Sequence, residues 1–177
     1  AVIRERYDLR PLNFTKSSEI LPWVDEMFEL FNNTYSRLSS FVPVSEAQKD
    51  YFKKKYISFI NPEYIKFVVD RNNRLIAFAI VMPSFSRALQ KAKGRLLPTG
   101  IFHLLRARKK SRDMLFYLIG ILPEYQKLGG NGLMYYELIR TILDSGYKRA
   151  EMVQIADTTS LMLADIKTLG GRIHKTH

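Results

Sequence analysis

The residues best suited to chemistry lie in a glycine-rich run at 126–132, which reads Gln-Lys-Leu-Gly-Gly-Asn-Gly. It follows an apolar stretch of strand length and precedes a segment with helical spacing of apolar residues. Backbone N–H groups at the start of a helix have no intrahelical acceptors, and the helix dipole adds partial positive charge there. Because glycines have no side chain to block the approach, a pyrophosphate can lie close to these groups. The run predicts a phosphate-binding turn, with a simple strand-to-helix turn as the alternative.

The common nucleotide-binding motifs do not fit this run. No Lys-Ser or Lys-Thr pair follows the glycines, as a P-loop requires, and the spacing differs from the dinucleotide motif G-x-G-x-x-G. The order Gln-x-x-Gly-x-Asn instead resembles the coenzyme A turn of the GNAT superfamily of acyl-CoA N-acyltransferases, which reads Gln/Arg-x-x-Gly-x-Gly/Ala. Gln126 and Gly129 match this pattern. Asn131 occupies the Gly/Ala position and tolerates unusual backbone angles better than most residues.

This resemblance implies acetyl-CoA or another acyl-CoA as co-substrate, an unidentified amine as acceptor, and no metal. In the family, the backbone of the fourth strand pairs with the pantetheine arm and the turn surrounds the pyrophosphate. A splayed fourth strand would also leave one backbone N–H facing the thioester carbonyl. Asp157 lies where the family commonly has asparagine. The expected coenzyme-binding residues are Ile119, Ile121, Leu122, Gln126, Lys127, Leu128, Gly129, Gly130, Asn131, Gly132 and Asp157.

Proton transfer is where the sequence departs from the family. Many relatives protonate the leaving thiolate with the tyrosine of Tyr-x-x-Leu-Gly-Phe, and the matching phrase at 166–171 begins with Ile166, which cannot donate a proton. Asp113 and Glu124 are candidates for a general base, although a strand-edge charge and a solvated turn residue are the simpler interpretations. The catalytic residues are left unassigned. The tyrosines that could replace the missing acid, each also explained by packing, are Tyr117, Tyr125, Tyr135 and Tyr136.

Composition limits the function classes. The chain has 177 residues, which is about one domain, and a net charge of +11, which favours anionic partners. It has no cysteine, so disulfides and thiolate metal sites are excluded and an intracellular, cytoplasmic setting is the default expectation. No apolar run reaches the roughly 18–20 residues of a membrane span.

The spacing of apolar residues predicts an alternation of strands and helices. Two of the predicted strands are joined by the turn-forming residues 70–74 and should pair as a hairpin. A near-continuous apolar run at 114–121 predicts a strand covered on both faces. Gly146 is placed to end the helix that follows the glycine-rich run. The expected strands are 7–14, 64–69, 75–82, 114–121 and 149–156, and the expected helices are 20–31, 46–60, 131–145 and 158–169.

This order matches the GNAT plan, so we expect an α+β fold with a mixed, mostly antiparallel sheet flanked by helices. We interpret residues 1–177 as a single GNAT-like domain. Phrases such as Phe59-Ile60-Asn61-Pro62 and Met82-Pro83-Ser84 resemble the C-terminal half of longer bacterial GNAT-like proteins, in which another domain precedes this one. The start at Ala1 also suggests a fragment, and a homodimer through an exposed sheet edge is a further alternative.

A basic segment at 84–111 interrupts the plan and should form two short helices. It contains no acidic residue. It could attract the 3′-phosphate of coenzyme A or an acidic acceptor, or it could be a solvated loop. Only Phe85 and Phe102 are available for base stacking, which argues against nucleic acid. Its basic residues are Arg87, Lys91, Lys93, Arg95, Arg106, Arg108, Lys109 and Lys110.

The predicted function is acyl-CoA-dependent N-acyl transfer, most simply acetyl transfer, to an amine. Two alternatives stay open. A catalytically degenerate acyl-CoA-binding or regulatory domain would explain Ile166. An anion-binding interaction module would explain the basic segment.

Overall fold

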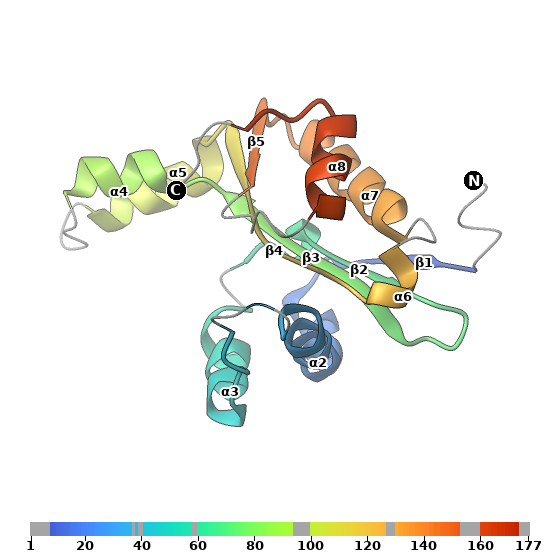
Figure 1. Ribbon diagram of the computed structural model, residues 1–177. Helices are drawn as coiled ribbons and strands as arrows, with labels where there is room; N and C mark the ends of the chain where they lie inside the picture. Colours follow the sequence, from blue (N-terminus) through green and yellow to red (C-terminus); the bar gives the residue numbers. More distant parts are fainter. Residues whose placement is uncertain are drawn as a thin grey trace.

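A five-stranded sheet forms the centre of the computed structural model, which describes residues 8–36, 38, 41–57, 60–93, 100–126, 130–152 and 160–173 (Figure 1). The strand order is β1-β2-β3-β4-β5, and each neighbouring pair is antiparallel except β4 and β5, which are parallel. The expected mixed, mostly antiparallel α+β fold is therefore confirmed. The strands are β1 (Arg10–Asn13), β2 (Ile65–Val69), β3 (Leu75–Pro83), β4 (Asp113–Ile121) and β5 (Arg149–Met152).

The predicted hairpin is formed by β2 and β3, and a buried carboxylate closes its turn. Asp70 Oδ1 accepts hydrogen bonds from the backbone N–H of Asn72 at 2.9 Å and of Arg74 at 3.0 Å. Asn73 has a positive φ of 62°, a conformation that asparagine adopts more readily than most residues. Every residue of β2 is buried, and β3 is buried except for Met82, so this hairpin is the centre of the core.

Helices cover both faces of the sheet (Figure 1). On one face lie α2 (Val24–Tyr35) and α3 (Glu46–Lys55), and on the other lie α7 (Gly130–Asp144) and α8 (Ser160–Thr168). The helix expected from residue 20 onward is present, but its first turn is a 3₁₀ turn and not α-helical. Two 3₁₀ turns, Ser17–Glu19 and Leu21–Trp23, precede α2. Pro22 has no N–H to donate, which is compatible with this short turn.

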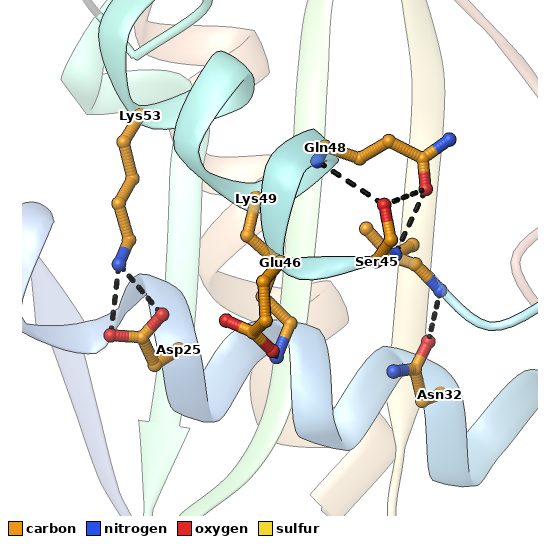
Figure 2. Close-up of polar contacts among 8 residues, drawn as sticks. Asp25, Asn32, Ser45, Glu46, Gln48, Lys49 and Lys53 are labelled. Atoms are coloured by element: carbon orange, nitrogen blue, oxygen red, sulfur yellow. Dashed lines mark hydrogen bonds and ion pairs between the residues drawn. The ribbon is translucent and has the colours of Figure 1, made fainter.

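The start of α3 is fixed by the predicted capping box (Figure 2). Ser45 Oγ accepts from Gln48 N–H at 3.4 Å, and Gln48 Oε1 accepts from Ser45 N–H at 2.9 Å. The helix is anchored to α2 by an ion pair of 2.7 Å between Lys53 Nζ and Asp25 Oδ1. The expected extension to residue 60 is wrong, because α3 ends at Lys55. Ile60, whose N–H donates to the Tyr56 carbonyl at 3.1 Å, is nevertheless buried in the core.

The C-terminal half confirms most of the expected elements. Gly146 and Gly170 follow α7 and α8 with φ of 75° and 79°, the left-handed conformation that commonly ends helices. Met134 and Leu138 of α7 are completely buried against the sheet. The structure shows β5 as far as Met152, and the rest of the expected strand lies outside the described residues.

The basic segment forms two helices, as predicted. α4 (Ser86–Ala92) and α5 (Gly100–Lys110) pack against each other and project from the sheet beside the start of β4 (Figure 1). A short helix that the sequence did not suggest, α6 (Pro123–Gln126), follows β4 directly. Among the described residues, no helix has both the length and the apolar composition that a membrane span requires.

Candidate active site

β4 has β5 as its outer neighbour along only the first half of its length. β5 pairs in parallel with β4 only from Asp113 to Phe116. At the same point the register between β3 and β4 shifts, since Phe116 pairs with Val81 and Leu118 with Ile80. Tyr117 is therefore an extra residue, a β-bulge, which bends a strand and interrupts its pairing. In the part of the chain that the structure describes, the edge of β4 beyond Tyr117 faces no strand.

This opening also corrects the expectation that β4 is covered on both faces. Tyr117 is 52% exposed, whereas Met114 and Phe116 on the other face are buried. The apolar run indicated the strand correctly. It did not reveal that the bulge and the departure of β5 uncover one side of it.

The open edge presents backbone groups of alternate residues. Leu122 N–H donates to the carbonyl of Ile76 on β3 at 2.9 Å, so the alternation of the strand turns the N–H and C=O of Ile121 and Ile119 away from β3. The Ile119 carbonyl accepts from Tyr35 Oη at 2.8 Å, and the Ile121 carbonyl accepts from Gln126 Nε2 at 3.3 Å. Within the described ranges, the two N–H groups have no acceptor, so an extended ligand that carries carbonyl oxygens could pair with them.

The helix α6 links this edge to the glycine-rich run, and three side chains hold it in place. Gln126 contacts the Ile121 carbonyl, and Tyr125 Oη donates to Asp70 Oδ2 at 3.1 Å. Glu124 lies 3.6 Å from the guanidinium of Arg74. The entrance to the glycine-rich run is thus fastened to the turn between β2 and β3.

The structure brings several of the expected coenzyme-binding residues to the open edge of β4 and the start of α7. Ile119, Ile121 and Gln126 lie on the open edge, whereas the buried Leu122 directs its N–H to β3. α7 begins at Gly130, so Gly130, Asn131 and Gly132 form its first turn. Lys127, Leu128, Gly129 and Asp157 lie outside the described residues. The positive end of the α7 dipole follows the C-terminal end of β4, as an anion site requires.

Tyr35, the last residue of α2, is a site residue that the sequence analysis missed. Besides its hydrogen bond to Ile119, its ring stacks on Phe31 with 4.4 Å between centroids and an interplanar angle of 26°. Phe41 lies 6.5 Å from the same ring. Burial raises the pKa of Tyr35, so its phenol is protonated at neutral pH. The available signal was the spacing, because Tyr35 continues the stripe of α2 four residues after Phe31.

The structure also places other residues that the sequence analysis considered for proton transfer. Asp113 is bound by Arg149, with Oδ1 at 2.8 Å from Nε and Oδ2 at 3.2 Å from a terminal nitrogen, and so ties β4 to β5. Tyr135 is buried, and Tyr136 is 60% exposed on α7. Ile166 lies on α8, where its carbonyl accepts from Gly171 N–H at 2.8 Å.

No protein-family model matches the chain. Among solved structures, an aminoglycoside acetyltransferase from an uncultured soil metagenomic sample, in complex with sisomicin, has a TM-score of 0.61 over 98% of this chain and 95% of its own, at 11% identity. An aminoglycoside N-acetyltransferase in complex with CoA has a TM-score of 0.56 over 96% and 90% of the two chains, at 9% identity. The ribosomal-protein-S18-alanine N-acetyltransferase of Escherichia coli has a TM-score of 0.54 over 92% and 76%, at 13% identity. The chain has the GNAT fold.

Within the GNAT fold, the strand that parts from its neighbour and the helix after it lie where the sequence analysis expected the coenzyme. A curated relative adds a different comparison. The chain is 22% identical over 160 residues to a bacterial ceramide synthase of Caulobacter vibrioides. The match covers 87% of this chain and 41% of that protein, so the chain spans less than half of the relative's length.

Three half-buried tyrosines predict a loss of stability at alkaline pH. Burial raises the pKa of Tyr147, which also shares a hydrogen bond of 3.2 Å with Tyr64, and burial raises the pKa of Tyr35 and Tyr125. Their contribution to stability is complete below the unfolded-state pKa of about 10 and is lost as pH rises toward the folded-state values. We expect the free energy of unfolding, measured by urea denaturation, to fall above about pH 10.

Tyr147→Phe should make this fall less steep, whereas Tyr136→Phe, at an exposed position, should leave the slope unchanged. A free energy of unfolding that stays constant up to about pH 11 would contradict the assignment.

Proposed function

We propose that this chain transfers an acyl group from an acyl-CoA to an amine. The observation that carries the proposal is the edge of β4 beyond the bulge at Tyr117, where two backbone N–H groups face the opening and the strand leads into the glycine-rich run. The GNAT fold supports it, as does the CoA bound by a structural relative.

The backbone supplies a track for the coenzyme in this proposal. The pantetheine arm carries two amides, whose carbonyl oxygens would accept from the N–H groups of Ile119 and Ile121. The carbonyls of these two residues are already bound by Tyr35 and Gln126. The pyrophosphate would lie against residues 126–132 and the start of α7, where glycines allow close approach and the helix dipole is positive.

The reaction requires an amine to attack the thioester carbonyl, forming a C–N bond and breaking the C–S bond. A backbone N–H at the bulge would stabilise the oxyanion of the tetrahedral intermediate. The amine loses a proton and the thiolate gains one. Tyr35 is our candidate donor to the sulfur, since its protonated phenol lies on the open edge and Ile166 cannot take this role.

A long-chain amine is the acceptor favoured by two observations. A ceramide is the amide of a fatty acid with a long-chain amino alcohol, and the chain is 22% identical to a bacterial ceramide synthase. The half-buried rings of Phe31, Tyr35 and Phe41 also form an apolar cluster beside the open edge. We propose such an acceptor as a second, narrower assignment, to be compared with short polar amines.

Coenzyme binding is tested by thermal unfolding with acetyl-CoA and with palmitoyl-CoA. Ligand at about 100 times its dissociation constant should add about 2.7 kcal/mol, which corresponds to a rise in Tm of roughly 5–10 °C. Gly129→Glu, which places a carboxylate in the glycine-rich run, should abolish the rise. Leu143→Glu adds the same charge at an exposed position near the other end of α7 and should retain it.

Turnover is measured as thiol release with a panel of short and long-chain amines. Binding with no release from any amine would replace the proposal by an acyl-CoA-binding domain. A folded protein whose Tm no acyl-CoA changes would overturn both.

A further inference from the structure

A basic groove of about 660 Å³ lies where the α4–α5 hairpin meets the starts of β4 and β5. Its acidic lining residue is Asp113, whose carboxylate is already bound by Arg149 and lies 3.8 Å from Arg87. Asp113 therefore does not neutralise the four other basic residues of the lining, which are Lys91, Arg106, Arg112 and Lys148. The basic lining residues are Arg87, Lys91, Arg106, Arg112, Lys148 and Arg149.

The groove is separate from the proposed acyl-CoA site. It adjoins Asp113 at the N-terminal end of β4, whereas the glycine-rich run follows the C-terminal end. A strand of this length separates the two places by roughly 25 Å. Any role of the groove therefore lies beyond the proposed transfer reaction.

The same hairpin exposes large apolar side chains beside its charges. On α5, Phe102 is 73% exposed and Leu105 is 52% exposed, and Arg106 follows at the next position of the same helical face. Leu89 of α4 is 49% exposed. The small Ala88 and Ala92 are the buried residues of α4. These three large apolar side chains are therefore exposed, as are the cations Arg87, Lys91 and Arg106.

Basic charge and exposed apolar groups on one element are the two properties of a segment that binds anionic membranes. The cations interact with lipid phosphates, and the apolar side chains enter the boundary between headgroups and acyl chains. No acidic residue occurs between Ser84 and Arg112, so nothing in the segment repels an anionic surface. A soluble phosphate ligand would leave Phe102 and Leu105 without a function.

We propose that the α4–α5 hairpin docks on an anionic lipid bilayer. Phe102 and Leu105 insert at the headgroup level, and the cations of the groove bind lipid phosphates. The docking does not depend on the acyl-transfer proposal, because it uses other residues and requires no acyl-CoA.

The test is co-sedimentation of the protein with vesicles of phosphatidylcholine, with and without about 40 mol% phosphatidylglycerol. We expect binding to the anionic vesicles that weakens with added salt, and at least about tenfold weaker binding to neutral ones. The paired variant Arg87→Glu with Lys91→Glu should weaken binding at least about tenfold. Its control, Lys54→Glu with Lys55→Glu on exposed positions of α3, makes the same charge change and should alter binding less than about twofold.

The apolar contribution is tested without changing charge. Phe102→Ser with Leu105→Ser should weaken vesicle binding at least about tenfold, and both positions are exposed, so the fold should be retained. In a Phe102→Trp variant, anionic vesicles should shift the added fluorescence to shorter wavelength, with the wild-type protein and its Trp23 as baseline.

Several results would overturn the proposal. Equal losses in the hairpin variant and the α3 control would show a non-specific effect of net charge. Unchanged binding of the double serine variant, or no fluorescence shift in the Phe102→Trp variant, would show that nothing inserts. Binding of inorganic phosphate or poly(U) RNA with no binding to vesicles would assign the groove to another ligand.

Discussion

Tyr35→Phe should lower kcat for acyl transfer by about 100-fold while changing acyl-CoA affinity less than about twofold. The phenol donates to the Ile119 carbonyl at 2.8 Å on the open edge of β4, and burial raises its pKa, so it carries a proton where the thiolate would leave. Phenylalanine keeps the ring and its stacking on Phe31 but removes the proton. The measurement is steady-state thiol release, with affinity taken from the thermal shift.

Two further tyrosines make this experiment decisive. Tyr136→Phe, at an exposed position of α7, is the control and should retain full activity. Tyr117 at the bulge is the rival donor, being 52% exposed beside the point where β4 and β5 separate. A large loss of kcat in Tyr117→Phe with none in Tyr35→Phe would transfer the role to Tyr117.

Gly120→Ala should destabilise the protein by about 1–3 kcal/mol. Gly120 on β4 lies directly opposite Phe78 on β3, and Phe78 is completely buried. A methyl group at Gly120 would overlap Cε1 of the Phe78 ring and lie 2.9 Å from its Cζ. Because the ring is completely buried in a close-packed core, moving it would displace its neighbours. Urea denaturation measures the change in the free energy of unfolding.

A double-mutant cycle identifies the cause. In a Phe78→Leu background the cost of Gly120→Ala should be much smaller, because the overlapping ring is gone. Gly146→Ala is the matched control, since its cost of about 1–2 kcal/mol comes from a φ of 75° with no neighbour within 4 Å. That cost should be the same in both backgrounds. An equal cost of Gly120→Ala with and without Phe78 would contradict the steric explanation.

The sequence predicted the order of the elements because their signals are local. The Ser45 capping box, the turn at Asp70 and the glycine at 146 each act through a few neighbouring residues. These signals were enough to predict the β2–β3 hairpin and the helices on either side of the sheet.

The features that the sequence did not predict depend on contacts between segments that are distant in the chain. The bulge at Tyr117 exists only in the register between β3 and β4, which neither strand specifies alone. Tyr35 becomes a site residue only when α2 lies across β4, and no local pattern associates it with Ile119, 84 positions later. The coenzyme contacts taken from the family resemblance stay predictions, and Leu122 shows why each needs its own test, since its N–H is committed to β3.

One buried carboxylate connects two parts of the chain that the sequence separates. Asp70 closes the turn between β2 and β3 with one oxygen and holds Tyr125 with the other. An insertion in that turn would therefore disturb two of the three side-chain contacts that hold α6, those of Tyr125 and Glu124, as well as lengthen a loop. Surface loops generally tolerate insertions, but this one contacts the segment that leads into the glycine-rich run, so a change in its length should also be felt there.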